Sequence, residues 1–186
     1  TGGVVLRLQR SEENLKSWIK YRSDIWRYDG AEEPLRRMAN TNSNLYAYRF
    51  DWDEQNNSSF AGNYQLFVGA AHGLEIPFLT GDFDLGPITF YIKPFMFPDD
   101  SDEGRLALSD LMMTYWANIA KYGNPNEFVK GPKWEKFTQE NNQLLILDNP
   151  TANLVEMRTI PVSKDDLLSQ IEADSALEIK ERCLIG

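Results

Sequence analysis

The chain has 186 residues, of which 42% are hydrophobic and 25% charged, a composition typical of a globular domain with a sizeable core. Its net charge of −9 argues against nucleic-acid binding, because a phosphate backbone requires a basic surface. A single cysteine, Cys183, excludes an internal disulfide and a cysteine zinc site, and a single histidine, His72, excludes a His-rich metal site. No run of about eighteen apolar residues is present. We therefore expect no nucleic acid, membrane, metal or cofactor among the partners of this chain.

The N-terminal part is predicted to be helical. Ser11 has the features of an N-cap, with acidic residues directly behind it and apolar residues at helical spacing. A second helical stretch is expected over residues 24–39, although Gly30 and Pro34 lie near its middle. Alternatively, Pro34 lies in the first turn of a separate helix that begins near residue 31. The chain opens without methionine, which we interpret as a processed chain, a trimmed one or a fragment.

The central part contains one strong strand and one irregular segment. Residues 45–52 are rich in aromatic side chains and bounded by polar clusters, which predicts a β-strand. Residues 80–103 contain three prolines and two glycines, and we expect them to be irregular, exposed and the most mobile part of the chain. The acidic run 99–103 is interpreted as charge at a helix N-terminus rather than as a metal site.

The C-terminal part is predicted to contain helices and short strands. Residues 104–122 have a wide apolar stripe that includes Tyr115 and Trp116, which we assign to the core, and Gly123 supplies a C-terminal stop. Short strands are expected at residues 144–147 and 154–157. A final helix is expected from about residue 164 to residue 183.

His72 is the candidate catalytic residue. It lies in a run of glycine and alanine a few residues beyond the predicted strand, a setting that can present a general base to a nucleophile, although a histidine that only fills a loop is the alternative. The sequence has no Gly-x-Ser-x-Gly elbow and no His-Gly-Gly-Gly stretch. Glu75 is a candidate to orient the imidazole, but such a glutamate is more often held in hydrogen bonds of its own. The chain therefore cannot complete a catalytic triad by itself.

Three segments of this sequence resemble the C-terminal part of type B carboxylesterases. They are YAYRFDW at residues 46–52, AHGLEIPFLTG at residues 71–81 and MMTYWANIAKYGNPN at residues 112–126. That family includes the cholinesterases and the bacterial para-nitrobenzyl esterases, and this chain looks closer to the bacterial members. The resemblance extends from about Tyr21 onward.

The resemblance implies an α/β fold in which residues 1–186 form the C-terminal portion of an α/β-hydrolase doubly wound sheet, with its last strands, the His loop and the covering and terminal helices. It makes His72 the triad histidine of a serine carboxylesterase that acts on a small-molecule ester. The nucleophilic serine and the triad acid would lie in the N-terminal part of the same enzyme, upstream of Thr1. The 186-residue chain alone is therefore expected to be inactive.

The resemblance also leaves several choices open. The alternative function is a cholinesterase-like interaction or scaffold protein that does not hydrolyse esters, and a weaker alternative is an independent domain of another kind. Aromatic and aliphatic side chains after His72 either line an acyl or alcohol pocket or pack in the core: Phe78, Leu79, Phe83 and Phe90. Both a bacterial cytoplasmic and a secreted location are compatible with the sequence.

Overall fold

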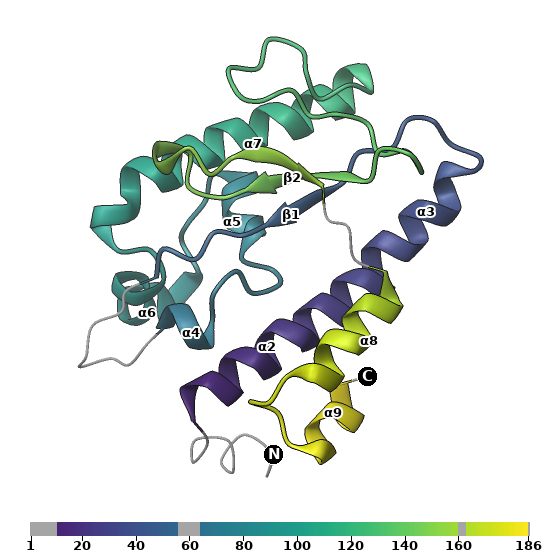
Figure 1. The fold of residues 1–186 in the computed structure, drawn as a ribbon. Helices are drawn as coiled ribbons and strands as arrows, with labels where there is room; N and C mark the ends of the chain where they lie inside the picture. Colours follow the sequence, from purple (N-terminus) through teal and green to yellow (C-terminus); the bar gives the residue numbers. More distant parts are fainter. Residues whose placement is uncertain (1–10, 56–63, 160–162, 186) are drawn as a thin grey trace. The chain divides into compact units, whose positions relative to one another are not determined.

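The computed structural model describes residues 11–55, 64–159 and 163–185. The chain divides into two compact units (Figure 1), one formed by Thr1–Asn42 with Ile160–Gly186 and the other by Ser43–Thr159. Each unit has its own buried cluster of apolar side chains, so each is described by itself.

The first unit is helical where the structure describes it. Its elements are α2 (Glu12–Arg27), a π-helical turn (Tyr28–Glu32), α3 (Glu33–Ala39), α8 (Lys164–Ala173) and α9 (Ile179–Ile185). Ser11 caps α2 as predicted, since its side chain accepts a hydrogen bond from the Asn14 backbone N–H. The predicted second stretch is helical throughout, but a π-helical turn at Gly30 replaces one α-helical turn, and Pro34 lies in the first turn of α3.

The predicted single C-terminal helix is wrong, because the structure has two helices there. Asp174 adopts an extended conformation after α8, and its carboxylate accepts a hydrogen bond from the Ala176 N–H at 2.8 Å. The resulting turn brings Leu177 into the buried cluster of this unit, which also contains Tyr21, Ile171 and Ile185. Burial of an apolar side chain therefore accompanies the interruption of the helix.

The second unit contains a small sheet and the helices that pack on it. Its elements are β1 (Tyr48–Phe50), α4 (Tyr64–Phe67), α5 (Glu75–Thr80), a 3-10 turn (Gly86–Ile88), α6 (Thr89–Met96), a 3-10 turn (Asp99–Ser101), α7 (Asp102–Tyr122), β2 (Gln143–Leu147), a 3-10 turn (Pro150–Ala152) and β3 (Glu156–Thr159). The strand order is β1-β2-β3, with β1 parallel to β2 and β3 antiparallel to it. The helical crossover between two parallel strands confirms the predicted α/β class.

The predicted strands are present with altered bounds. Regular β1 is shorter than the predicted 45–52, but the Leu145 N–H donates to the Ala47 carbonyl and the Asp51 N–H to the Leu147 carbonyl, each at 2.9 Å. The ladder therefore extends beyond both ends of β1. β3 begins two residues later than predicted because Asn153, at φ 58°, ends the preceding 3-10 turn.

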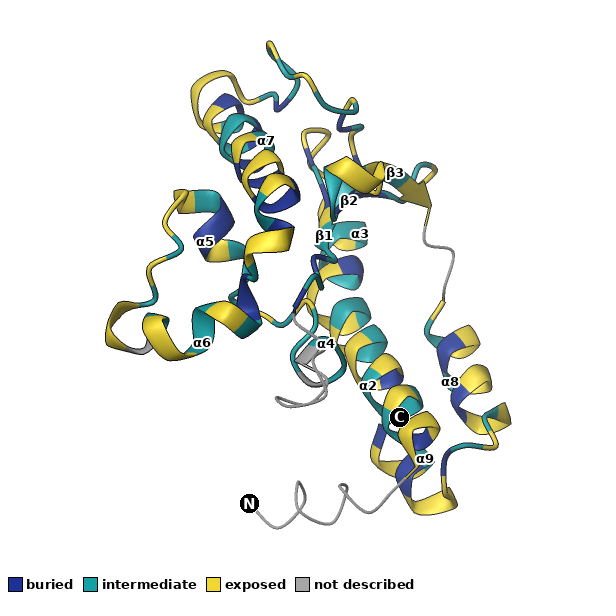
Figure 2. Ribbon diagram, turned by 90° about the vertical axis from the view of Figure 1, so that its left-hand side faces the viewer, coloured by how far each residue is buried: buried dark blue, intermediate teal, exposed yellow. Residues whose placement is uncertain are grey.

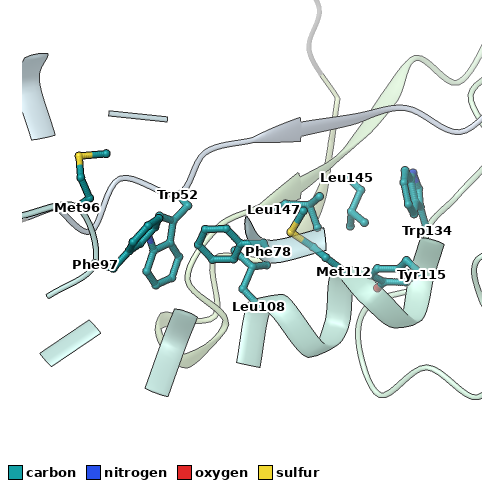
Figure 3. Packing of buried hydrophobic residues seen from close by; sticks show 10 residues of the cluster. All are labelled: Trp52, Phe78, Met96, Phe97, Leu108, Met112, Tyr115, Trp134, Leu145 and Leu147. Carbon is teal, nitrogen blue, oxygen red and sulfur yellow. The ribbon is translucent and has the colours of Figure 1, made fainter. Parts of the chain in front are cut away.

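Helix α7 supplies one side of the core, as its apolar stripe predicted. Gly123 ends the helix in the left-handed conformation at φ 66°, which favours glycine. Figure 2 shows α5 and α7 on the same side of β1 and β2. The buried cluster runs along this layer (Figure 3) and contains Trp52, Phe78, Met96, Phe97, Leu108, Met112, Tyr115, Trp134, Leu145 and Leu147.

The expectation that residues 80–103 are irregular is wrong for much of the segment, whereas many of its residues are exposed as expected. It contains α6 and two 3-10 turns, and Phe97 directly after α6 is only 1% exposed. Phe97 lies against Phe78 and Phe83, so aromatic packing with a distant helix fixes a segment whose prolines predicted a loop. The acidic residues Asp102 and Glu103 occupy the first turn of α7, which confirms their interpretation as helix N-terminal charge.

Candidate active site

His72 lies in the turn between α4 and α5. The residue is exposed. Gly69 at φ +51° and Gly73 at φ +92° bound the turn, and both conformations favour glycine. The Leu74 N–H donates to the Ala71 carbonyl at 3.1 Å, which closes the turn around His72. The loop placement matches the predicted one, and the catalytic role of His72 stays a prediction.

Glu75 is held by the backbone of the same turn. Its Oε2 accepts a hydrogen bond from the Gly73 N–H at 2.8 Å, at the start of α5. Glu75 therefore has a hydrogen bond of its own with the backbone, as expected for a glutamate that does not orient the imidazole. The carboxylate thus fixes the side of the turn that follows His72.

Gln55, in the polar segment after β1, binds the backbone of the turn before His72. The Gln55 side chain is 5% exposed, and its Nε2 donates to the Gly69 carbonyl at 2.9 Å. Nearby, burial raises the pKa of the Asp53 carboxyl, while a hydrogen bond with the Gln65 side chain opposes this effect. Gln55 could not be predicted from the sequence, since nothing in the local sequence distinguishes it from an exposed loop residue.

Carboxylates gather where β1 and β2 end. The pKa of Asp148, which follows β2, is raised to about 6. Burial is the largest cause, and the charges of nearby carboxylates add to it, while the hydrogen bond from the Asn149 N–H opposes them; these carboxylates are Asp53, Asp51 and Glu54. Asp51 also forms an ion pair with Arg49. Among the described residues, no three His, Cys, Asp or Glu side chains come together in a way that could hold a metal ion.

The aromatic side chains after His72 have different environments. Phe78 is fully buried and Phe83 packs against it with ring centroids 5.1 Å apart, so both belong to the core. Phe90 is 82% exposed. Tyr115 is fully buried and Trp116 packs against the same cluster, which confirms their assignment to the core. Cys183 is exposed in the first unit.

The second unit also contains a cavity of about 750 Å³. It is lined by residues that precede β1 and β2 and follow α7, among them Tyr46, Tyr122 and Trp134. Neither His72 nor its neighbours in the turn line this cavity. No helix in the described ranges is long and apolar enough to span a bilayer.

Comparison with known proteins identifies the family. The sequence profile of the Carboxylesterase family matches residues 6–164. The chain therefore belongs to the carboxylesterase family.

Individual relatives match shorter stretches. The chain is similar to acetylcholinesterase of Gallus gallus, with 32% identity over 103 residues that cover 55% of this chain and 11% of that protein. It is similar to Neuroligin-3 of Macaca mulatta, with 40% identity over 68 residues that cover 37% of this chain and 30% of that protein. A solved structure, "PNB esterase", matches with a TM-score of 0.44 and 24% identity over 66% of this chain and 21% of its own. The chain thus spans less than a third of the length of each of these relatives.

Proposed function

We propose that the complete protein containing this chain hydrolyses carboxylic esters and that His72 is its general base. The observation that carries this proposal is the position of His72, an exposed histidine on the short loop between α4 and α5 in a chain of the carboxylesterase family.

The proposed mechanism passes through an acyl-enzyme. The imidazole of His72 accepts the proton of a serine hydroxyl as the serine oxygen bonds to the ester carbonyl carbon. His72 then gives this proton to the alkoxy oxygen, so that the alcohol leaves as its C–O bond breaks. In the second half, His72 accepts a proton from water, whose oxygen attacks the acyl carbon. The proton returns to the serine oxygen as the acid is released.

The serine and the carboxylate that orients the imidazole are proposed to come from the remainder of the same protein. The sequence contains no serine elbow, and Glu75 already accepts a hydrogen bond from the Gly73 backbone. We therefore expect the 186-residue chain by itself to be inactive toward esters. Robust turnover of a para-nitrophenyl ester by the purified chain would contradict this expectation.

The test is replacement of His72 in the complete protein. His72→Ala is expected to lower kcat for para-nitrophenyl acetate by at least about 10²–10⁴-fold, the range for loss of a general base, with more for a member of a triad. Ile76→Ala is a matched control, because Ile76 is exposed in the adjacent helix α5. An unchanged kcat in His72→Ala would remove His72 from the proposed role.

The non-catalytic alternative predicts a different outcome. A complete, folded protein that turns over no ester substrate, with or without the His72→Ala change, would select the interaction or scaffold function. Family membership alone does not separate the two, since one family profile covers this chain in either case.

A further inference from the structure

We infer that Gln55 is a positioning residue for His72, and that its side-chain amide fixes the backbone from which the imidazole projects. This inference rests on the proposed function, because it assigns to Gln55 an effect on the general base. It concerns one hydrogen bond, from Gln55 Nε2 to the Gly69 carbonyl at 2.9 Å, which joins residues fourteen apart in the sequence.

The His72 turn is held at two points. On the side that follows His72, Glu75 binds the Gly73 N–H and α5 is anchored by Phe78, which is fully buried and whose carbonyl accepts a hydrogen bond from Ser109 Oγ at 2.8 Å. On the side that precedes His72, the Gln55 amide binds the Gly69 carbonyl.

The residues that join Gly69 to His72 have small side chains. Ala70 and Ala71 have only methyl side chains, and Ala70 is exposed. Gly69 itself adopts φ +51°, where a Cβ would lie 3.2 Å from the Gln65 carbonyl oxygen. Val68, one residue earlier, packs against the buried cluster, and the hydrogen bond from Gln55 to Gly69 adds to this packing in fixing the backbone that leads to His72.

The environment of Gln55 suits a fixed role. The side chain is 5% exposed, so it is shielded from competing water. Its Oε1 is buried and has no hydrogen-bond partner among the described residues. A buried amide with an unsatisfied acceptor is unfavourable for folding, and such groups in native structures call for a functional or structural reason. Positioning the loop of a general base supplies that reason.

The experiment compares two substitutions of similar shape in the complete protein. Gln55→Met removes the donor, and Gln55→Glu replaces it with an oxygen that, when ionised, repels the Gly69 carbonyl. We expect Gln55→Met to lower kcat for para-nitrophenyl acetate by about 10- to 100-fold, the effect of a base displaced by about 1 Å. KM should change less than threefold, and Gln55→Glu should be slower than Gln55→Met at pH 8.

The matched control is Gln143→Met, because the Gln143 side chain donates an exposed hydrogen bond of 3.4 Å to Thr159 Oγ1. This variant should retain wild-type kcat. All variants are assayed well below their Tm, with the folded fraction measured by circular dichroism at the assay temperature.

The inference is overturned by a Gln55→Met variant whose kcat stays within twofold of wild type. It is also overturned if the loss of kcat equals the loss of folded protein, since Gln55 would then be merely structural. Failure of the proposed function gives a separate result, in which His72→Ala itself retains turnover. A Gln55 effect in a protein that requires His72 is the supporting outcome.

Discussion

Replacing Asp148 by asparagine is expected to stabilise the protein near neutral pH. Asp148 follows β2 and is half-buried beside the carboxylates of Asp51, Asp53 and Glu54. Asparagine keeps a side-chain oxygen that can accept the hydrogen bond from the Asn149 N–H, which measures 2.7 Å. The substitution therefore removes the charge with little change in shape.

The magnitude follows from the raised pKa. A rise of the Asp148 pKa from its ordinary 3.8 to about 6 corresponds to about 3 kcal/mol against the ionised form in the folded state. Because Asp148 is only half-buried, solvent screening reduces this to about 1–2 kcal/mol. Below about pH 4, the carboxyl is protonated in both states and the penalty is absent. The penalty develops as the pH rises from about 4 to about 6 and is complete above that range.

The assay is the difference in free energy of unfolding between Asp148→Asn and wild type, measured by urea denaturation at pH 4 and pH 7.5. We expect the variant to be more stable by about 1–2 kcal/mol at pH 7.5, with a difference near zero at pH 4. Asp110→Asn is the control, since Asp110 is exposed on α7 and its variant should follow wild type. A stability difference that does not change with pH would refute the reasoning.

Two further predictions concern stability. Gly104→Ala is expected to lower the free energy of unfolding by about 1–3 kcal/mol, because a Cβ would lie 2.3 Å from Asn149 Oδ1. The Thr151 N–H and hydroxyl hold this oxygen by hydrogen bonds. A Tm equal to or above that of wild type would show that Asn149 moves aside and that the higher helix propensity of alanine dominates. Ser163→Ala should destabilise α8 by about 1 kcal/mol, because Ser163 and Asp166 form a capping box. The measurement is amide hydrogen exchange, which should become faster in α8 alone. Unchanged exchange in α8 would mean that the cap contributes nothing to its stability.

Features set by neighbours along the chain could be predicted from the sequence. The Ser11 cap, the long helix α7 with its glycine stop and the apolar strand β2 all follow from residues within a few positions of one another. The segment around His72 was also evident, because small residues on both sides of a histidine form a local pattern. These signals arise from backbone conformation and local hydrogen bonding, which the nearby sequence controls.

Features that depend on distant partners were decided only by the tertiary structure. The interruption of the C-terminal helix places Leu177 against Tyr21 of α2, and the ordering of residues after α6 depends on contacts of Phe97 with Phe78. Neither pairing leaves a mark on the local sequence, because the energy of apolar burial depends on which surfaces meet and not on spacing along the chain.

The candidate site shows the same division. The sequence by itself predicted that His72 lies on a short loop rich in glycine and alanine beyond a strand, and it showed that the chain holds no serine elbow. Only the tertiary structure decided that Gln55 binds the Gly69 carbonyl and that Asp148 is half-buried among other carboxylates. Hydrogen bonding and desolvation act through space, so the properties of a polar side chain follow from its surroundings in the folded protein.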